Sequence, residues 1–133
     1  MKGGNFLDTN IIVYSLGNNQ KKKEITNSLI DSNPIISTQV INELVNVCLK
    51  KLKLTKEESF KVGRFLLTKC SIKTLNISTI DSAMNISIKY NFSYWDSLII
   101  SSALENGCSI VYSEDLQHNQ VIENKLKILN PYI

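Results

Sequence analysis

Residues 6–14 have the sequence FLDTNIIVY, in which an acidic residue, Asp8, directly follows a short apolar run. Residues 5–7 are typical of a buried strand, and the apolar residues between positions 11 and 16 indicate a short helix after it. Asp8 therefore lies where a strand ends and a helix begins. Helix capping alone would explain an Asp at this place. Because a cap does not need an acid directly after a buried strand, we interpret Asp8 as a functional residue.

Short apolar runs and amphipathic segments alternate along the rest of the chain. Helical spacing predicts helices over residues 20–31, 38–52 and 78–90, from residue 55 and from residue 93. Further strands are expected over residues 34–37, 72–77, 109–112 and 127–129. The helix from residue 55 has an expected apolar stripe of Phe60, Val62, Phe65, Leu66 and Leu67. This order predicts an α/β fold, a three-layer α/β/α sandwich with a mainly parallel sheet of about five strands, in one domain over residues 1–133.

The composition is that of a globular protein outside the membrane. Of the 133 residues 43% are hydrophobic, which is enough for a core, and no apolar run approaches the roughly 20 residues that span a bilayer. The first residues lack the pattern of a secretory signal, so we expect a soluble, cytoplasmic protein. The three cysteines form no CxxC pair, which argues against a disulfide framework or a zinc site.

Positive charge is concentrated in one part of the chain. Residues 21–73 contain eleven Lys or Arg and five Asp or Glu, whereas the remaining residues contain four and seven. A lysine run is usually a solvated helix face. The alternative is a positive surface beside an acidic site, which would suit an anionic polymer.

Three further acids are expected at the edge of the sheet where Asp8 lies. Glu43 shares a helical face with apolar valines, and Asp96 is in the first turn of its helix. Asp115 follows an apolar strand, as Asp8 does. Because the carboxyl ends of parallel strands meet at one edge, we expect the four carboxylates to share a pocket.

Such a cluster favours a divalent cation. Two carboxylates about 5 Å apart repel each other by roughly 3 kcal/mol at an effective dielectric constant near 20. A divalent ion reverses that interaction and supports hydrolysis of a phosphodiester. The chain has a single histidine, His118, so the ligands are mainly oxygen, which favours Mg²⁺ or Mn²⁺.

Each acid also has a structural alternative. Asp96 follows Ser93 at the spacing of a capping box. Asp115 is compatible with an ordinary turn, and its neighbour Glu114 is an alternative ligand. Glu43 is compatible with a surface ion pair to a lysine.

Four segments resemble the motifs of PIN domains in the order that this family has, and they are residues 6–14, 37–43, 94–99 and 113–119. The pattern is most similar to the ribonuclease toxins of VapBC-type toxin–antitoxin systems. The resemblance implies Mg²⁺- or Mn²⁺-dependent cleavage of RNA, with a 5′-phosphate and a 3′-hydroxyl as products. It also implies a homodimer and a cognate antitoxin that blocks the acidic pocket with a basic side chain.

The resemblance assigns roles to individual residues. The implied metal-binding and catalytic acids are Asp8, Glu43, Asp96 and Asp115. The implied supporting residues are Thr9 and Asn10, beside Asp8, and Ser113, which hydrogen-bonds within the acid cluster. Relatives often have Gly where Asn119 stands, but Asn also tolerates the left-handed backbone.

Other functions remain open at this point. The alternatives are a PIN nuclease in RNA processing that is not a toxin, and a non-catalytic PIN-like RNA-binding module. A phosphatase of the haloacid-dehalogenase type needs Asp where Asn10 stands, and a receiver domain needs Lys where Ser113 stands. We interpret Trp95 as a core residue in preference to one that stacks on a base, and His118 as an exposed loop residue.

Overall fold

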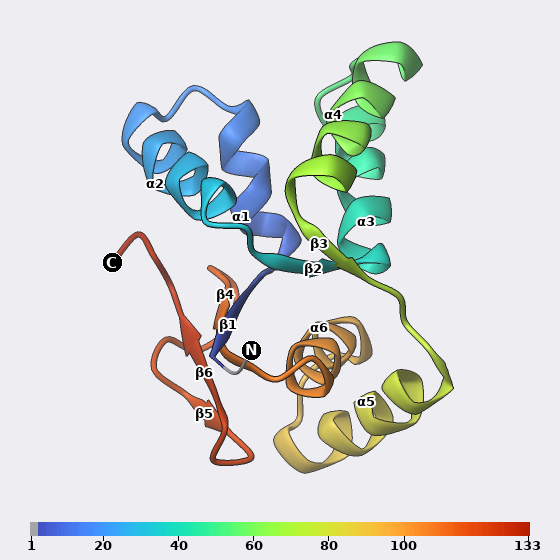
Figure 1. Ribbon diagram of the computed structural model, residues 1–133, viewed down its shortest axis with the longest axis vertical. Helices are drawn as coiled ribbons and strands as arrows, with labels where there is room; N and C mark the ends of the chain where they lie inside the picture. Colours follow the sequence, from blue (N-terminus) through green and yellow to red (C-terminus); the bar gives the residue numbers. More distant parts are fainter. Residues whose placement is uncertain (1–2) are drawn as a thin grey trace.

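The computed structural model describes residues 3–133, which form a sheet covered by helices on both faces (Figure 1). The six strands are β1 (Gly4–Leu7), β2 (Ile35–Ser37), β3 (Ser71–Lys73), β4 (Cys108–Tyr112), β5 (Val121–Ile122) and β6 (Leu126–Leu129). Their order is β3-β2-β1-β4-β6-β5, and all neighbours are parallel except β5 and β6. The predicted three-layer sandwich with a mainly parallel sheet is confirmed; β5 is a short antiparallel strand that the sequence did not indicate.

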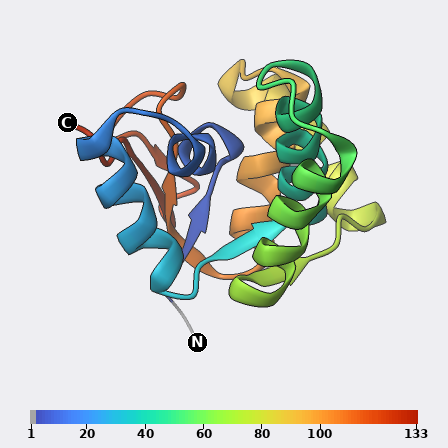
Figure 2. The ribbon, with the colours of Figure 1, turned by 90° about the horizontal axis from the view of Figure 1, so that it is seen from above.

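The helices divide into two groups. They are α1 (Thr9–Val13), the 3₁₀ helix η1 (Tyr14–Leu16), α2 (Gln20–Asp31), α3 (Thr38–Lys50), α4 (Lys56–Lys69), α5 (Ile77–Tyr90) and α6 (Tyr94–Glu105). Figure 1 shows α1–α4 on one side of the sheet and the hairpin of α5 and α6 on the other, and Figure 2 shows α2 on the opposite flank of the molecule from α3 and α4. The reason is handedness, because right-handed crossovers place their helices on opposite faces when the direction of strand addition reverses. Within residues 3–133, no helix has the length and apolar character needed to span a membrane.

The strand order reverses between β1 and β4, which lie side by side at the centre of the sheet. Phe6 is paired with Val111 and Leu7 with Tyr112, so the two strands end level with each other. The N–H of Asp8 continues the ladder by donating to the carbonyl of Tyr112 at 3.0 Å. Whatever follows β1 therefore lies beside whatever follows β4, and ligand sites of parallel sheets form at such a reversal.

The hydrophobic core lies between the sheet and the helices on each of its two faces. Side chains with at most 1% of their surface exposed include Phe6, Leu7, Ile11, Ile36, Val40, Leu44, Ile99, Ile100, Val111 and Ile128. Burial of each side chain of this size contributes about 1.5–3 kcal/mol to stability. The three cysteines are free thiols and buried, as expected for small apolar residues.

Two local predictions were wrong. The strand predicted over residues 72–77 ends at Lys73, because Asn76 caps α5 in a reciprocal pair of hydrogen bonds with Thr79. In α4, Leu66 is buried, whereas Phe65 and Leu67 are 54% and 52% exposed. The helix turns its small residues toward α3 instead, and a Cβ at Gly63 would lie 3.1 Å from a methyl carbon of Val45. Close approach of two helices decided which face is buried.

Candidate active site

The four acids singled out in the sequence line one pocket at the carboxyl ends of β1 and β4. Its volume is about 610 Å³, and it is bounded by α1, α3, the start of α6 and the loop after β4. The residues that line it are Asp8, Thr9, Asn10, Val13, Tyr14, Glu43, Asn46, Val47, Lys51, Asp96, Glu114 and Asp115. The tertiary structure thus brings together acids from four separate segments of the chain.

Asp8 is the most deeply buried of the four, with 6% of its surface exposed. Its Oδ1 accepts the N–H of Thr9 at 2.7 Å, and its Oδ2 accepts the hydroxyl of Ser113 at 2.9 Å. Asp8 is therefore the N-cap of α1 and also a wall of the pocket, so both interpretations of this residue hold structurally. Burial raises the pKa of Asp8 to about 6; the charges of Asp96 and Glu43 add to the rise, and the hydrogen bonds from Ser113 and Thr9 oppose it.

Both carboxylate oxygens of Glu43 have partners. The hydroxyl of Thr9 donates to Oε1 at 2.7 Å, and the side-chain amide of Gln39 donates to Oε2 at 3.1 Å. None of the ion pairs within residues 3–133 includes Glu43, so the interpretation as a lysine partner finds no support. The two donors instead fix the carboxylate at the pocket wall.

Asp96 lies in the first turn of α6, as the sequence predicted. Ser93 caps that helix, and its hydroxyl accepts the N–H of Asp96 at 3.1 Å. Burial raises the pKa of Asp96, the charges of Asp115 and Glu43 raise it further, and a hydrogen bond with Ser93 lowers it. The cap and the acidic cluster are compatible, because the cap uses the N–H of Asp96 while the residue also lines the pocket with the other acids.

Asp115 is an exposed residue that Asn10 connects to the other acids. The amide nitrogen of Asn10 donates to Oδ2 of Asp115 at 3.0 Å and to Oδ2 of Asp8 at 3.2 Å. The carbonyl oxygen of Asn10 accepts the N–H of Glu114 at 3.1 Å. One amide thus places its partial positive charge between two carboxylates and fastens the loop after β4 to α1.

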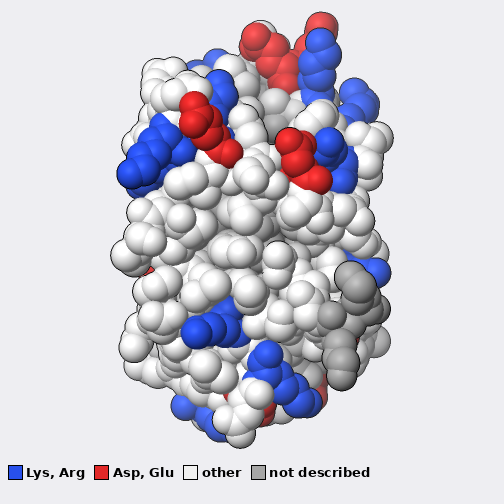
Figure 3. Space-filling model, turned by 60° about the vertical axis from the view of Figure 1, so that its left-hand side comes forward, with Lys and Arg blue, Asp and Glu red and all other residues white. Residues whose placement is uncertain are grey.

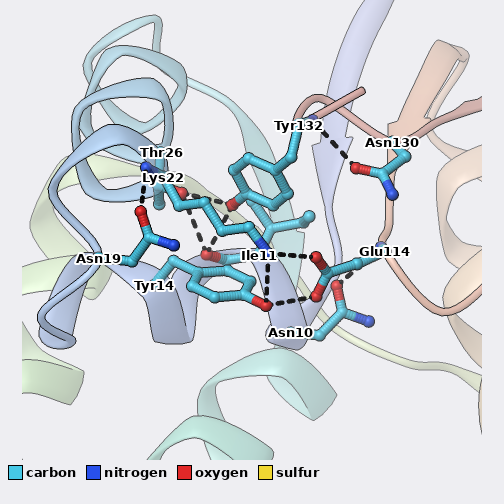
Figure 4. A network of polar contacts seen from close by, with 9 residues as sticks. All are labelled: Asn10, Ile11, Tyr14, Asn19, Lys22, Thr26, Glu114, Asn130 and Tyr132. Carbon is cyan, nitrogen blue, oxygen red and sulfur yellow. Dashed lines mark hydrogen bonds and ion pairs between the residues drawn. The ribbon is translucent and has the colours of Figure 1, made fainter.

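Glu114 does not turn its carboxylate to this cluster but binds Lys22 and Tyr14 (Figure 4). Lys22 lies 2.8 Å from Oε2 and the phenol of Tyr14 lies 2.5 Å from Oε1, and these hydrogen bonds lower the pKa of Glu114. The ammonium of Lys22 also lies 4.4 Å from the centre of the Tyr14 ring. Of the two neighbouring acids, Asp115 is therefore the one available to the cluster.

The pocket fits a hard divalent cation, because its acidic side chains are all carboxylates and oxygen is the ligand that such ions prefer. The negative charges of Asp96 and Glu43 also contribute to the raised pKa of Asp8, and a cation would offset them. Across residues 3–133, no three acidic, histidine or cysteine side chains already lie close enough to enclose a metal ion. Hydrogen bonds from Thr9, Asn10 and Ser113 partner the carboxylates instead.

The sequence pattern of the PIN domain matches residues 6–124. The chain belongs to the PIN-domain family. A search of curated protein sequences found no significant match.

Solved structures with the same fold include bacterial toxins. This PIN domain is similar to a toxin–antitoxin complex from Klebsiella pneumoniae, with 17% identity, a TM-score of 0.73 and 97% of this chain and 98% of that chain covered. It is similar to DNA-bound VapBC from Salmonella typhimurium, with 18% identity, a TM-score of 0.71 and 95% and 96% covered. It is also similar to VapC20 from Mycobacterium tuberculosis, a sarcin–ricin-loop-cleaving toxin, with 13% identity, a TM-score of 0.69 and 84% and 90% covered. At these identities the likeness shows the fold.

One face of the PIN domain has a mixed charge pattern. On the face that carries α2 and the C-terminal segment, Lys and Arg side chains lie next to Asp and Glu at the upper end, and the middle is almost uncharged (Figure 3). This face matches a solvated surface more closely than a continuous basic one. Lys51, by contrast, lines the acidic pocket itself.

Several residues of this PIN domain differ from the sequence interpretation. Trp95 is 63% exposed, so the expectation of a core residue was wrong; its ring packs against the neighbouring ring of Tyr94, with centroids 5.4 Å apart. His118 is half-buried and not exposed, since its Nδ1 accepts the N–H of Asn130 at 2.9 Å. Asn119 has a φ of 71°, the left-handed conformation that was expected. Gln39 was missed; its only signal was its position four residues before Glu43.

Proposed function

We propose that this PIN domain is a Mg²⁺- or Mn²⁺-dependent endoribonuclease and the toxin of a VapBC-type toxin–antitoxin pair. The observation that carries the proposal is the convergence of Asp8, Glu43, Asp96 and Asp115 on one pocket at the reversal of strand order. None of these acids forms an ion pair within residues 3–133. Gathered carboxylates without such a partner are costly, and a function is the simplest reason to keep them. The toxin assignment rests on the motifs and on the fold shared with solved toxins.

The four carboxylates would hold the cation, and a divalent ion bound there supplies neutralisation of the scissile phosphate and activation of water. The remaining residues orient the acids. Thr9 holds Glu43, Ser113 holds Asp8, and Asn10 spans Asp8 and Asp115. These contacts already restrict the carboxylates, so less conformational freedom is lost when an ion binds.

The substrate we propose is RNA, and Lys51 is the pocket residue suited to its backbone. Lys51 is the C-cap residue of α3, eight residues after Glu43, and it lines the pocket with Glu43. A cation in the same pocket as the acids suits the phosphate of a neighbouring nucleotide, because phosphate contacts set the position of the strand without reading its bases.

The partner we propose is an antitoxin that places a basic side chain among the acids. An apolar groove of about 510 Å³ between α2 and α4 lies next to the pocket. Helix α1 contributes to both, with Ile12 in the groove and Thr9 and Asn10 in the pocket. An antitoxin segment in the groove would reach the acids. An antitoxin gene next to the gene of this protein would support the toxin assignment.

We also propose a homodimer formed through α5. Ile77, Ile80, Met84 and Ile88 are 87%, 36%, 51% and 83% exposed and recur every three or four residues, so they form one stripe. The charged residues of this helix are Asp81 and Lys89, and Lys89 is paired with Glu123. Because the stripe is apolar and carries little net charge, the same stripe of a second copy can pack against it across a twofold axis. Ile88→Lys is expected to convert a dimer to a monomer in light scattering, and an unchanged mass would refute this interface.

The test of the nuclease is cleavage-site mapping on total RNA. The wild-type protein is expected to cleave with Mg²⁺ and to stop with EDTA, leaving 5′-phosphate ends. Asp96→Asn is expected to be inactive with an unchanged circular dichroism spectrum. RNA binding without cleavage by the wild type would favour the non-catalytic PIN-like module. Cleavage without toxicity on expression would favour a PIN nuclease of RNA processing.

A further inference from the structure

Gln39 connects two of the acidic segments through one nitrogen atom. Its side-chain amide nitrogen donates to Oε2 of Glu43 at 3.1 Å and to the carbonyl oxygen of Trp95 at 3.2 Å. Trp95 directly precedes Asp96 in the first turn of α6, while Gln39 and Glu43 are one turn apart in α3. A single amide therefore joins the helix that carries Glu43 to the helix end that carries Asp96.

The orientation of this amide has a cost for the fold. Gln39 is 8% exposed, and its carbonyl oxygen Oε1 is buried without a hydrogen-bond partner among residues 3–133. A buried acceptor without a partner typically costs about 1–3 kcal/mol. The opposite orientation would turn the carbonyl oxygen toward two other oxygens, so Glu43 and Trp95 determine which way the amide points. A position selected for stability alone would suit an apolar side chain.

We propose that Gln39 is a positioning residue that sets the separation of Glu43 and Asp96 for the divalent cation. The inference rests on the proposed function. Glu43 and Asp96 line the same pocket, so their carboxylates repel each other when no ion is bound. The amide nitrogen opposes that repulsion by holding Glu43 and the backbone beside Asp96 to one point. Part of the ordering that ion binding requires is then already present.

Gln39→Met tests this role, because Met has a similar length and volume but no amide. It removes the donor to Glu43 and Trp95, and it also removes the unpartnered oxygen. If Gln39 positions the acids, affinity for the cation falls while stability is retained or increases. A residue with a merely structural role would not separate these two effects.

The chain offers a matched control in α2. Gln20 donates to Oε2 of Glu24 at 3.0 Å with the same four-residue spacing, but on an exposed surface away from the pocket. Gln20→Met removes a hydrogen bond between the same two residue types. It is expected to leave cation binding unchanged.

Trp95 provides a readout that does not depend on cleavage, because it is the only tryptophan and it is next to Asp96. Paramagnetic Mn²⁺ bound among the acids is expected to quench its fluorescence in a saturable way, and Mg²⁺ is expected to reverse the quenching by competition. The wild type, Gln39→Met and Gln20→Met are titrated with Mn²⁺, and each is unfolded in urea in the presence of EDTA. We expect the Mn²⁺ midpoint of Gln39→Met to rise about ten- to a hundred-fold, the range typical for loss of a partner of a metal ligand.

The possible results lead to different conclusions. Equal midpoints for Gln39→Met and the wild type would overturn the positioning role and leave the proposed nuclease intact. A large loss of stability in Gln39→Met would assign Gln39 to the fold and would also overturn the inference. A wild-type protein that shows no saturable, Mg²⁺-reversible quenching would overturn the metal-dependent function and this inference with it.

Discussion

The hydroxyl of Ser113 donates a hydrogen bond to Oδ2 of Asp8 across 2.9 Å, although 105 residues separate them in the chain. The contact follows from the sheet, because β1 and β4 are parallel neighbours that end level with each other. It places the first residue after one strand against the first residue after the other. Asp8 is buried at this junction, and its ionisation should therefore be visible in the stability of the protein.

The stability of the metal-free protein is expected to fall as the pH rises from about 4 to 6. Burial raises the pKa of Asp8 from 3.8 to about 6, so in this window the folded protein binds more protons than the unfolded chain does. The shift corresponds to about 3 kcal/mol lost over the window and not regained above it. Urea unfolding in EDTA at several pH values measures the loss. Asp8→Asn should have a flatter profile, and identical profiles for both proteins would contradict the assignment.

Magnesium is expected to stabilise the wild-type protein and not Asp8→Asn. An ion that binds the folded state alone stabilises it by about 2.7 kcal/mol when its concentration is a hundred times the dissociation constant. Melting temperatures with Mg²⁺ and with EDTA give the comparison. Constant ionic strength in the two buffers excludes a general salt effect. A shift of equal size in both proteins would place the ion elsewhere.

Asp115→Asn is expected to reduce cleavage, whereas Glu114→Gln is expected to retain it. The carboxylate of Glu114 is bound to Lys22 and Tyr14, and that of Asp115 is connected to Asp8 through Asn10. We expect Asp115→Asn to lose at least about ten-fold in activity. Removing a residue that only hydrogen-bonds to a metal ligand already costs about that much, and a ligand should cost no less. Initial rates on one RNA substrate decide between the two acids. The reverse ranking would identify Glu114 as the fourth acid.

Thr9→Val is expected to weaken activity about ten-fold, whereas Thr9→Ser keeps it. Both side chains fit the position, but only the hydroxyl can donate to Oε1 of Glu43 at 2.7 Å. The loss should shrink at high Mg²⁺ concentration, because the ion itself then holds the carboxylate. Rates measured over a range of Mg²⁺ concentrations test this. Equal losses in the two variants would attribute the effect to packing instead of the hydrogen bond.

Much of the fold and of the acid set could be predicted from local sequence. The helix over residues 20–31 has its predicted limits, and the helices predicted from residues 55 and 93 have Thr55 and Ser93 as their N-caps. Asp8 and Asp115 follow their strands as predicted. These features depend on hydrogen bonds and spacing among residues that are close in the chain, so the sequence alone determined them.

The tertiary structure decided what long-range contact requires. It buried Gly63 and exposed Phe65, exposed Trp95, and added Gln39 to the acidic pocket. It also turned Glu114 toward Lys22 and left Asp115 to the cluster. Each of these outcomes depends on which elements become neighbours and how closely they approach. Strand order and helix packing set those distances, and residue type and local spacing do not encode them.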